Sequence, residues 1–235
     1  MTAKPKIRIL VALVALLACL QPLAAAEVKG TVTVDYRGLF SADSGAQSYP
    51  VSVALEPAAG QKTIRRAARR QVIEIIDNRM RPAFITVQKG DHIRFINRDS
   101  VFHEVFSLSP GEPVSVRLGK TKEHNASTEL VLDQVGTTHF FCRIHNKSYA
   151  RVDVVDTSYL QMIQPGQVFH FVGLSPGKWT LRLASPAGET RRVPVTAMTS
   201  PPPLQLTIAS RDGGFADSRL KPQAGIEQLY PVSEW

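Results

Sequence analysis

The chain has 235 residues, of which 43% are hydrophobic and 20% charged, with 28 Lys and Arg against 20 Asp and Glu. This mixture is typical of globular proteins and excludes a wholly disordered, collagen-like or disulfide-dense chain. The densest basic patch, at residues 65–70, lies outside any recognisable nucleic-acid-binding module. Because the net charge of +8 is only a modest excess, we expect no nucleic-acid partner.

The first 26 residues have the layout of a secretory signal peptide. Lys4, Lys6 and Arg8 precede an unbroken apolar run at residues 9–20, and small residues follow at 24–26. An apolar run of this length is too short to span a bilayer, and no later segment approaches the ~20 residues that a membrane helix needs. We therefore expect a periplasmic mature protein with a net charge of +5 and no integral membrane segment.

The chain contains two cysteines, Cys19 and Cys142. Cys19 lies inside the predicted signal peptide, where residues 16–19 also resemble a lipoprotein box, so a lipid anchor on Cys19 stays open as an alternative. Cys142 is then the one cysteine of the mature chain. An unpaired thiol is a liability in an oxidising compartment, so Cys142 requires burial, a metal or a chemical role.

Hydrophobic residues alternate with a period of two along most of the chain, which predicts β-strands. Two strands are expected early, at residues 28–36 and 51–55. Eight short strands follow at 72–76, 84–87, 92–97, 101–107, 114–118, 130–132, 138–142 and 150–155. This rhythm is typical of an antiparallel sandwich or barrel. From residue 157 the pattern restarts, with strands expected around 169–183, 192–196 and 204–209.

Three side chains within these strands and loops form a candidate metal site. Cys142 and His145 belong to a C-x-x-H loop between two predicted strands, and His103 lies 39 residues before the cysteine. A thiolate with two imidazoles is a soft trigonal ligand set, to which copper is best suited among the available metals. Metal binding also deprotonates the thiol and occupies the sulfur, so that the cysteine is no longer a free thiol in an oxidising compartment. Another metal such as zinc, or a sandwich in which Cys142 and His145 are merely packed, remains open.

Residues 71–155 resemble a cupredoxin of the amicyanin/plastocyanin type. The matching pieces are residues 87–91, 93–97, Asp99 with His103, Gly136, residues 140–142, and His145. The whole chain also resembles exported proteins often labelled methylamine utilization proteins. In those proteins, segments similar to a carboxypeptidase-regulatory or transthyretin-like β domain flank the cupredoxin.

The resemblance implies that His103, Cys142 and His145 bind one mononuclear copper. It also implies that Asn97 is the asparagine that braces the cysteine loop. The axial methionine of the family falls at position 148, which is Ser148 in this chain. A hydroxyl is a weak, hard ligand for copper, so we expect a site that is either three-coordinate or open to water.

The predicted fold class is all-β, with a Greek-key cupredoxin sandwich and a second, smaller transthyretin-like β-sandwich. Residues 28–56 and 157–209 are each too short for a domain, so our hypothesis is that they combine into one discontinuous sandwich, with the copper module either inserted into it or packed tightly on it. The expected segments are 1–26 (signal peptide), 27–60 (N-terminal strands of a sandwich), 61–70 (basic linker), 71–156 (cupredoxin domain), 157–210 (C-terminal sandwich segment) and 211–235 (loosely ordered tail).

The function expected from these features is one-electron transfer in the periplasm, without enzymatic activity. The basic charge favours an acidic redox partner such as a c-type cytochrome. The alternative is a non-redox protein that holds copper or acts as a scaffold or binding module of the cell envelope, with a degenerate cupredoxin domain.

Overall fold

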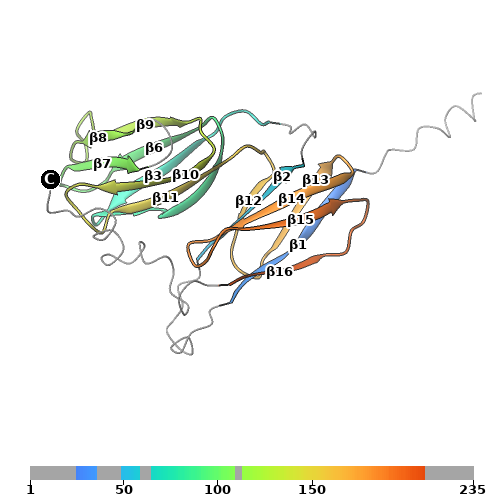
Figure 1. The fold of residues 1–235 in the computed structure, drawn as a ribbon. Coiled ribbons are helices and arrows are strands. Elements are labelled where there is room, and N and C mark those ends of the chain that lie inside the picture. Colours follow the sequence, from blue (N-terminus) through green and yellow to red (C-terminus); the bar gives the residue numbers. More distant parts are fainter. Residues whose placement is uncertain (1–24, 36–48, 59–64, 109–112, 210–235) are drawn as a thin grey trace, which may run out of the picture.

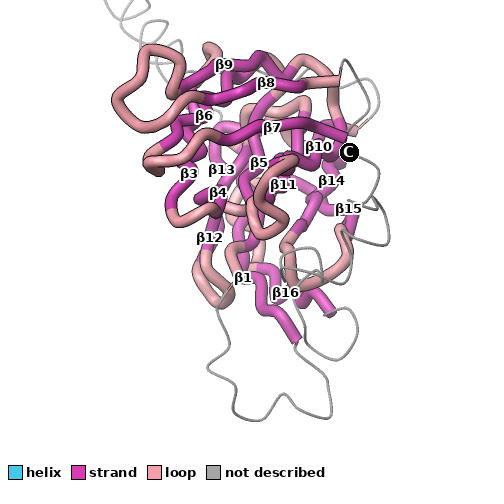
Figure 2. Tube along the Cα trace, turned by 90° about the vertical axis from the view of Figure 1, so that its left-hand side faces the viewer, coloured by secondary structure: helices cyan, strands magenta, loops and turns pink. Residues whose placement is uncertain are grey.

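The computed structural model describes residues 25–35, 49–58, 65–108 and 113–209. Within these ranges every regular element is a β-strand, as Figure 2 shows, so the predicted all-β class is confirmed. None of the described residues forms a helix of the length and apolarity needed to cross a bilayer. The signal-peptide prediction for residues 1–24, which include Cys19, and the predicted tail at 211–235 lie outside the described residues.

The middle of the chain forms a two-sheet sandwich, which we call the inserted sandwich. Its sheets have the strand orders β5-β11-β10-β7-β8 and β4-β3-β6-β9. The strands are β3 (Arg70–Ile76), β4 (Arg79–Arg81), β5 (Phe84–Gln88), β6 (Asp91–Asn97), β7 (His103–Leu108), β8 (Ser115–Leu118), β9 (Ser127–Leu132), β10 (Gly136–Cys142) and β11 (Tyr149–Val155). Phe95 and Phe140, fully buried and 4.9 Å apart between ring centroids, lie at the centre of its core.

The two ends of the described chain form the other sandwich, which we call the split sandwich. Its sheets have the orders β13-β1-β16 and β12-β2-β14-β15. The strands are β1 (Ala26–Asp35), β2 (Val51–Pro57), β12 (Leu160–Ile163), β13 (Val168–Leu174), β14 (Gly177–Ala184), β15 (Arg191–Ala197) and β16 (Leu204–Ala209). In Figure 1 the blue strands β1 and β2 lie among the orange strands of the last part of the chain. The second sandwich is therefore discontinuous in sequence, as predicted.

Strand β1 lies between β13 and β16, and its sequence suits this central place. Val28 and Val32 are buried, while the intervening Lys29 and Thr31 are only partly so. A Cβ atom at Gly30 would collide with the backbone and side chain of Leu204 in β16, so the glycine permits the close approach of the two strands. Ala26, assigned above to the signal segment, is fully buried opposite Leu174.

The chain leaves the split sandwich after β2 and returns to it at β12, and these two strands are antiparallel neighbours. Leu160 of β12 pairs with Ala54 of β2. Next to this pair the Thr157 hydroxyl donates a hydrogen bond of 2.7 Å to the Leu55 carbonyl. Because the exit and the return are adjacent, a whole sandwich can be inserted between them without disturbing the host.

The basic patch at residues 65–70 is more ordered than the linker that the sequence predicted. Asp91, which is fully buried, accepts a hydrogen bond of 2.7 Å from the Arg66 guanidinium and one of 2.8 Å from the Arg69 amide. Burial raises the pKa of Asp91, but the bonds from Arg66, Arg69 and the Gln88 amide outweigh it and hold the pKa below its ordinary value. The patch is thus pinned to the inserted sandwich, and Arg70 already belongs to β3.

A buried carboxylate joins the two sandwiches. Asp153 of β11 is fully buried and accepts two hydrogen bonds of 2.8 Å from Arg151, one of 2.7 Å from Arg182 of β14, and one of 2.9 Å from the Thr137 hydroxyl. Burial raises the pKa of Asp153, and the neighbouring Arg151 and Arg182 lower it by more, so that it stays below the ordinary value. Removal of one partner from such a cluster leaves buried charges without compensation.

We predict that Asp153→Asn destabilises the protein by about 3–5 kcal/mol near neutral pH, because Arg151 and Arg182 keep their charges in a buried place. The folded-state pKa of Asp153 is depressed, so its stabilising contribution is complete above the ordinary value of 3.8 and is lost as the pH falls below it. Urea unfolding at a series of pH values should show a shallower acid-side decline for the variant than for the parent. The exposed Asp133→Asn is the matched control and should behave like the parent; equal acid sensitivity of parent and Asp153→Asn would contradict the assignment.

Candidate metal centre

The pairing of β7 with β10 brings two of the predicted ligands together. In this antiparallel pair Cys142 lies opposite Val105 and Phe141 opposite Phe106, so Cys142 is a diagonal neighbour of His103. Side chains alternate between the faces of a strand. His103, Val105 and Cys142 therefore point into the sandwich, where His103 is 0% and Cys142 6% exposed.

A tight turn after β10 brings in the third predicted ligand, His145. The Ser148 amide donates a hydrogen bond of 2.9 Å to the His145 carbonyl, and the Cys142 amide donates one of 3.2 Å to the Ser148 carbonyl. The Arg143 amide extends the β7–β10 ladder by a bond of 3.0 Å to the Glu104 carbonyl. The turn is thus held at both ends, and the ring of His145 folds back toward Cys142.

The three ligand atoms form a compact triangle. The Cys142 Sγ lies 3.6 Å from the His103 Nδ1 and 3.7 Å from the His145 Nδ1, and the two Nδ1 atoms are 3.1 Å apart. In the part of the chain that the structure describes, this is the one group of three or more Cys, His, Asp or Glu side chains arranged to hold a metal ion. The structure therefore brings together the three residues that the sequence singled out as metal ligands.

The size of this triangle fits a metal ion. The point equidistant from the three atoms lies about 2.0 Å from each, which follows from the three distances; metal–nitrogen bonds in proteins are about 2.0–2.1 Å and metal–thiolate bonds about 2.3 Å long. Two ring nitrogens that face each other at 3.1 Å repel if both carry lone pairs. A cation between them removes this repulsion, and a thiolate with two imidazoles suits copper.

Asp99 orients His103 and was not assigned this role from the sequence. Its carboxylate accepts a hydrogen bond of 2.9 Å from the His103 Nε2, which leaves the unprotonated Nδ1, with its lone pair, on the side of Cys142 and His145. The carboxylate also accepts bonds of 2.8 Å from the Asp77 amide and 3.0 Å from the Asn78 amide. Although burial raises the pKa of Asp99, the Asn78, Asp77 and His103 bonds together hold it below the ordinary value.

Burial also keeps His103 ready to bind a cation. Desolvation lowers the pKa of His103 below its ordinary value, against the opposing effect of the Asp99 hydrogen bond. The imidazole is therefore neutral at neutral pH, with its proton on the nitrogen that faces Asp99. A neutral ring is the form that ligates a metal.

Asn97 braces a different loop from the one that the resemblance implied. Its side-chain amide donates bonds of 2.7 Å to the Val101 and Gly119 carbonyls, and its side-chain oxygen accepts one of 2.8 Å from the Asp99 amide. These partners belong to the loop before His103 and to the end of β8, not to the cysteine loop. Asn97 therefore stabilises the segment that carries Asp99 and His103, because the turn after β6 folds back over the end of that strand.

Ser148, at the position of the axial methionine, is buried beside the cysteine. Its exposure is 1%, and its backbone carbonyl accepts the bond from the Cys142 amide. The Ser148 Oγ is buried without a hydrogen-bond partner among the described residues. A buried hydroxyl without a partner is costly, and a nearby cation or water would satisfy it.

No family model matches the chain, and no curated protein matches it either. Solved structures with a similar fold include a purple cupredoxin from Nitrosopumilus maritimus (20% identity, TM-score 0.31, 36% of this chain and 98% of that chain). They also include amicyanin from Paracoccus versutus (16%, 0.32, 43% and 91%) and the Cu-containing nitrite reductase of Thermus scotoductus (17%, 0.33, 43% and 25%).

We predict that the protein binds one equivalent of Cu(II), and that Cys142→Ser abolishes its thiolate-to-copper absorption in the visible range. The band requires a copper–sulfur bond, which an alkoxide or hydroxyl cannot replace. Titration followed by absorption spectroscopy and metal analysis measures both effects. His92→Gln is the control, since His92 pairs with Glu129 on β9 and should leave the spectrum unchanged.

We predict that Asp99→Asn weakens copper binding by about 10–100-fold, because the residue that holds the orientation and tautomer of His103 loses its charge. Competition with a chelator of known affinity measures the change. Asp77→Asn is the control on the same turn: the Asp77 side chain is 81% exposed and pairs with Arg81, so its loss should leave the affinity near that of the parent. Equal affinities of the parent and Asp99→Asn would show that His103 needs no such support.

Proposed function

We propose that this protein is an exported, periplasmic carrier of single electrons that holds one copper ion between His103, Cys142 and His145. The observation that carries the proposal is the triangle of two Nδ1 atoms and one Sγ, whose size fits a single ion. Bound copper would supply the redox change. The residues of the chain hold its ligand atoms on a stiff sandwich, so that little rearrangement accompanies the gain or loss of an electron.

The exposure of the ligands supports a route for the electron. His103 and Cys142 are buried, whereas His145 is partly exposed. Apolar side chains next to the ligands in sequence are also exposed: Phe102 by 37% and Ile144 by 44%. Exposed apolar side chains around one accessible ligand are suited to a brief contact with a partner.

We infer an acidic redox partner, such as a c-type cytochrome, from the charges near these side chains. The Arg117 guanidinium lies 3.9 Å from the centroid of the Phe102 ring, and the Arg143 guanidinium, which also pairs with Glu104 at 3.0 Å, lies 4.7 Å from that of Phe106. Both cations flank the strand that begins with His103. Opposite charge on the partner would accelerate the encounter. The proposed role requires no enzymatic activity. The relation of this chain to exported methylamine utilization proteins stays a prediction.

A second candidate function is copper holding without electron transfer, and Ser148 favours it. The chain offers no thioether at this position, and the unpartnered Oγ of Ser148 is a polar atom that a bound water would satisfy. Water at the metal increases the rearrangement that accompanies a redox change, which suits storage or a scaffold of the envelope better than fast transfer.

We predict that the copper-loaded protein gives a reversible one-electron wave in protein-film voltammetry, and that Ser148→Met lowers its midpoint potential. A thioether donor adds electron density to the metal, and its absence in the parent raises the potential. Ser148→Ala is the matched control, because it removes the hydroxyl without adding a donor and should stay near the parent. A parent that binds copper in a colourless, redox-silent form would instead support the copper-holding function.

A further inference from the structure

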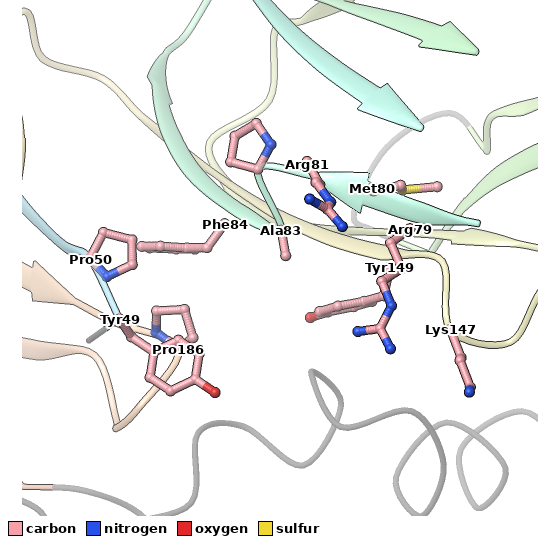
Figure 3. A pocket seen from close by; sticks show the side chains of 11 residues that line it. Tyr49, Pro50, Arg79, Met80, Arg81, Ala83, Phe84, Lys147, Tyr149 and Pro186 are labelled. Carbon is pink, nitrogen blue, oxygen red and sulfur yellow. The ribbon is translucent and has the colours of Figure 1, made fainter. Parts of the chain in front are cut away.

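A pocket of about 430 Å³, a size typical of sites for small molecules, lies between the two sandwiches. One side belongs to the split sandwich and the other to the inserted sandwich, and Figure 3 shows the two groups of side chains facing each other. The lining residues are Tyr49, Pro50 and Pro186 from the split sandwich, and Arg79, Met80, Arg81, Pro82, Ala83, Phe84, Lys147 and Tyr149 from the inserted sandwich. The predicted copper ligands are not among them, so this pocket is distinct from the metal centre.

The charged side chains at the pocket are all basic. Arg79, Arg81 and Lys147 line it, and none of the lining residues that the structure describes is acidic. Within the part of the chain that the structure describes, neither Arg79 nor Lys147 has an ion pair or a side-chain hydrogen bond, and Arg81 has only a long contact of 3.8 Å with the exposed Asp77. Cations gathered in a concave site without a counter-charge attract an anion. Guanidinium groups bind carboxylates with paired hydrogen bonds.

Rings and flat apolar side chains form the other walls. The rings of Tyr49, Phe84 and Tyr149 line the pocket together with Pro50 and Pro186. Figure 3 shows the Tyr149 hydroxyl directed toward the side that carries Tyr49 and Pro186. Phe84 and Tyr149 are 4% exposed each and are therefore held in place by packing. Tyr49 is only partly buried, so its side chain is the one of the three that can pack against a flat apolar group over a larger area.

The same contacts that join the sandwiches hold one wall of the pocket. The Arg151 guanidinium lies 5.2 Å from the centroid of the Phe84 ring, and it also binds the buried carboxylate of Asp153. Tyr149 is further fixed by a hydrogen bond of 2.8 Å between its hydroxyl and the His139 Nδ1. The walls are thus preformed, so a ligand would lose little affinity to their ordering.

We propose that this pocket binds a small aromatic carboxylate. The acid group lies among Arg79, Arg81 and Lys147, and the ring lies against Tyr49 and the small exposed parts of Phe84 and Tyr149. The volume accommodates a single substituted ring, and the absence of acidic side chains among the lining residues excludes cationic ligands on electrostatic grounds. The proposal is independent of copper binding, because the lining contains no predicted metal ligand.

Benzoate is the probe that tests the proposal, by isothermal titration calorimetry on the mature protein with and without added copper. We expect saturable binding to one site in both forms. Acetate, which lacks the ring, and benzyl alcohol, which lacks the charge, should each bind at least tenfold more weakly. Inorganic phosphate distinguishes a general anion site: if it binds as tightly as benzoate, the aromatic part of the proposal is wrong.

The double variant Arg79→Gln/Lys147→Gln should weaken benzoate binding at least tenfold while its thermal midpoint stays near that of the parent, since both side chains are exposed. The matched control is Lys89→Gln/Arg94→Gln, which removes the same charge from β6 and the turn before it and should bind benzoate like the parent. The proposal is overturned if benzoate shows no saturable binding to the parent up to about 10 mM, or if the two double variants bind it equally.

Discussion

The register of β7 against β10 is the constraint on which the candidate metal centre depends. Cys142 opposes Val105 in this pair, and a slip of one residue would turn the thiol to the outer face of the sheet. The register is set by apolar residues on the same strands, since Val105 and Phe140 are both fully buried in the core of the inserted sandwich. The packing of the core therefore sets the register that places Cys142 next to His103, and no further interaction is needed to bring these two side chains together.

Three carboxylates with lowered pKa values organise the rest of the inserted sandwich. Asp91 pins the preceding basic segment, Asp99 orients His103, and Asp153 joins the split sandwich. Each is largely withdrawn from water and is compensated by several donors, so its charge is retained at neutral pH. The three groups lie at different places on the inserted sandwich. Ionised carboxylates therefore hold the preceding segment, the candidate metal ligand His103 and the contact with the split sandwich.

The insertion places one short segment of chain at both the candidate metal centre and the pocket between the sandwiches. The turn that carries His145 continues through Lys147 into Tyr149, and the latter two line the pocket between the sandwiches. One short segment of chain therefore contributes to the metal centre at one end and to a basic pocket at the other. The split sandwich supplies the opposite wall, which the inserted sandwich alone would lack.

The sequence by itself determined the all-β class and most strands, because the period of two is a local feature. The segment lengths and the family resemblance predicted the split sandwich and the three residues that meet. The sequence missed β4 and β12, which have three and four residues. Only the tertiary structure decided that Asp99 orients His103, that Asn97 braces the loop before His103, and that Asp153 joins the sandwiches. Each of these facts depends on which distant strands lie side by side, and the pairing of strands is set by the packing of the whole core, which no short stretch of sequence encodes.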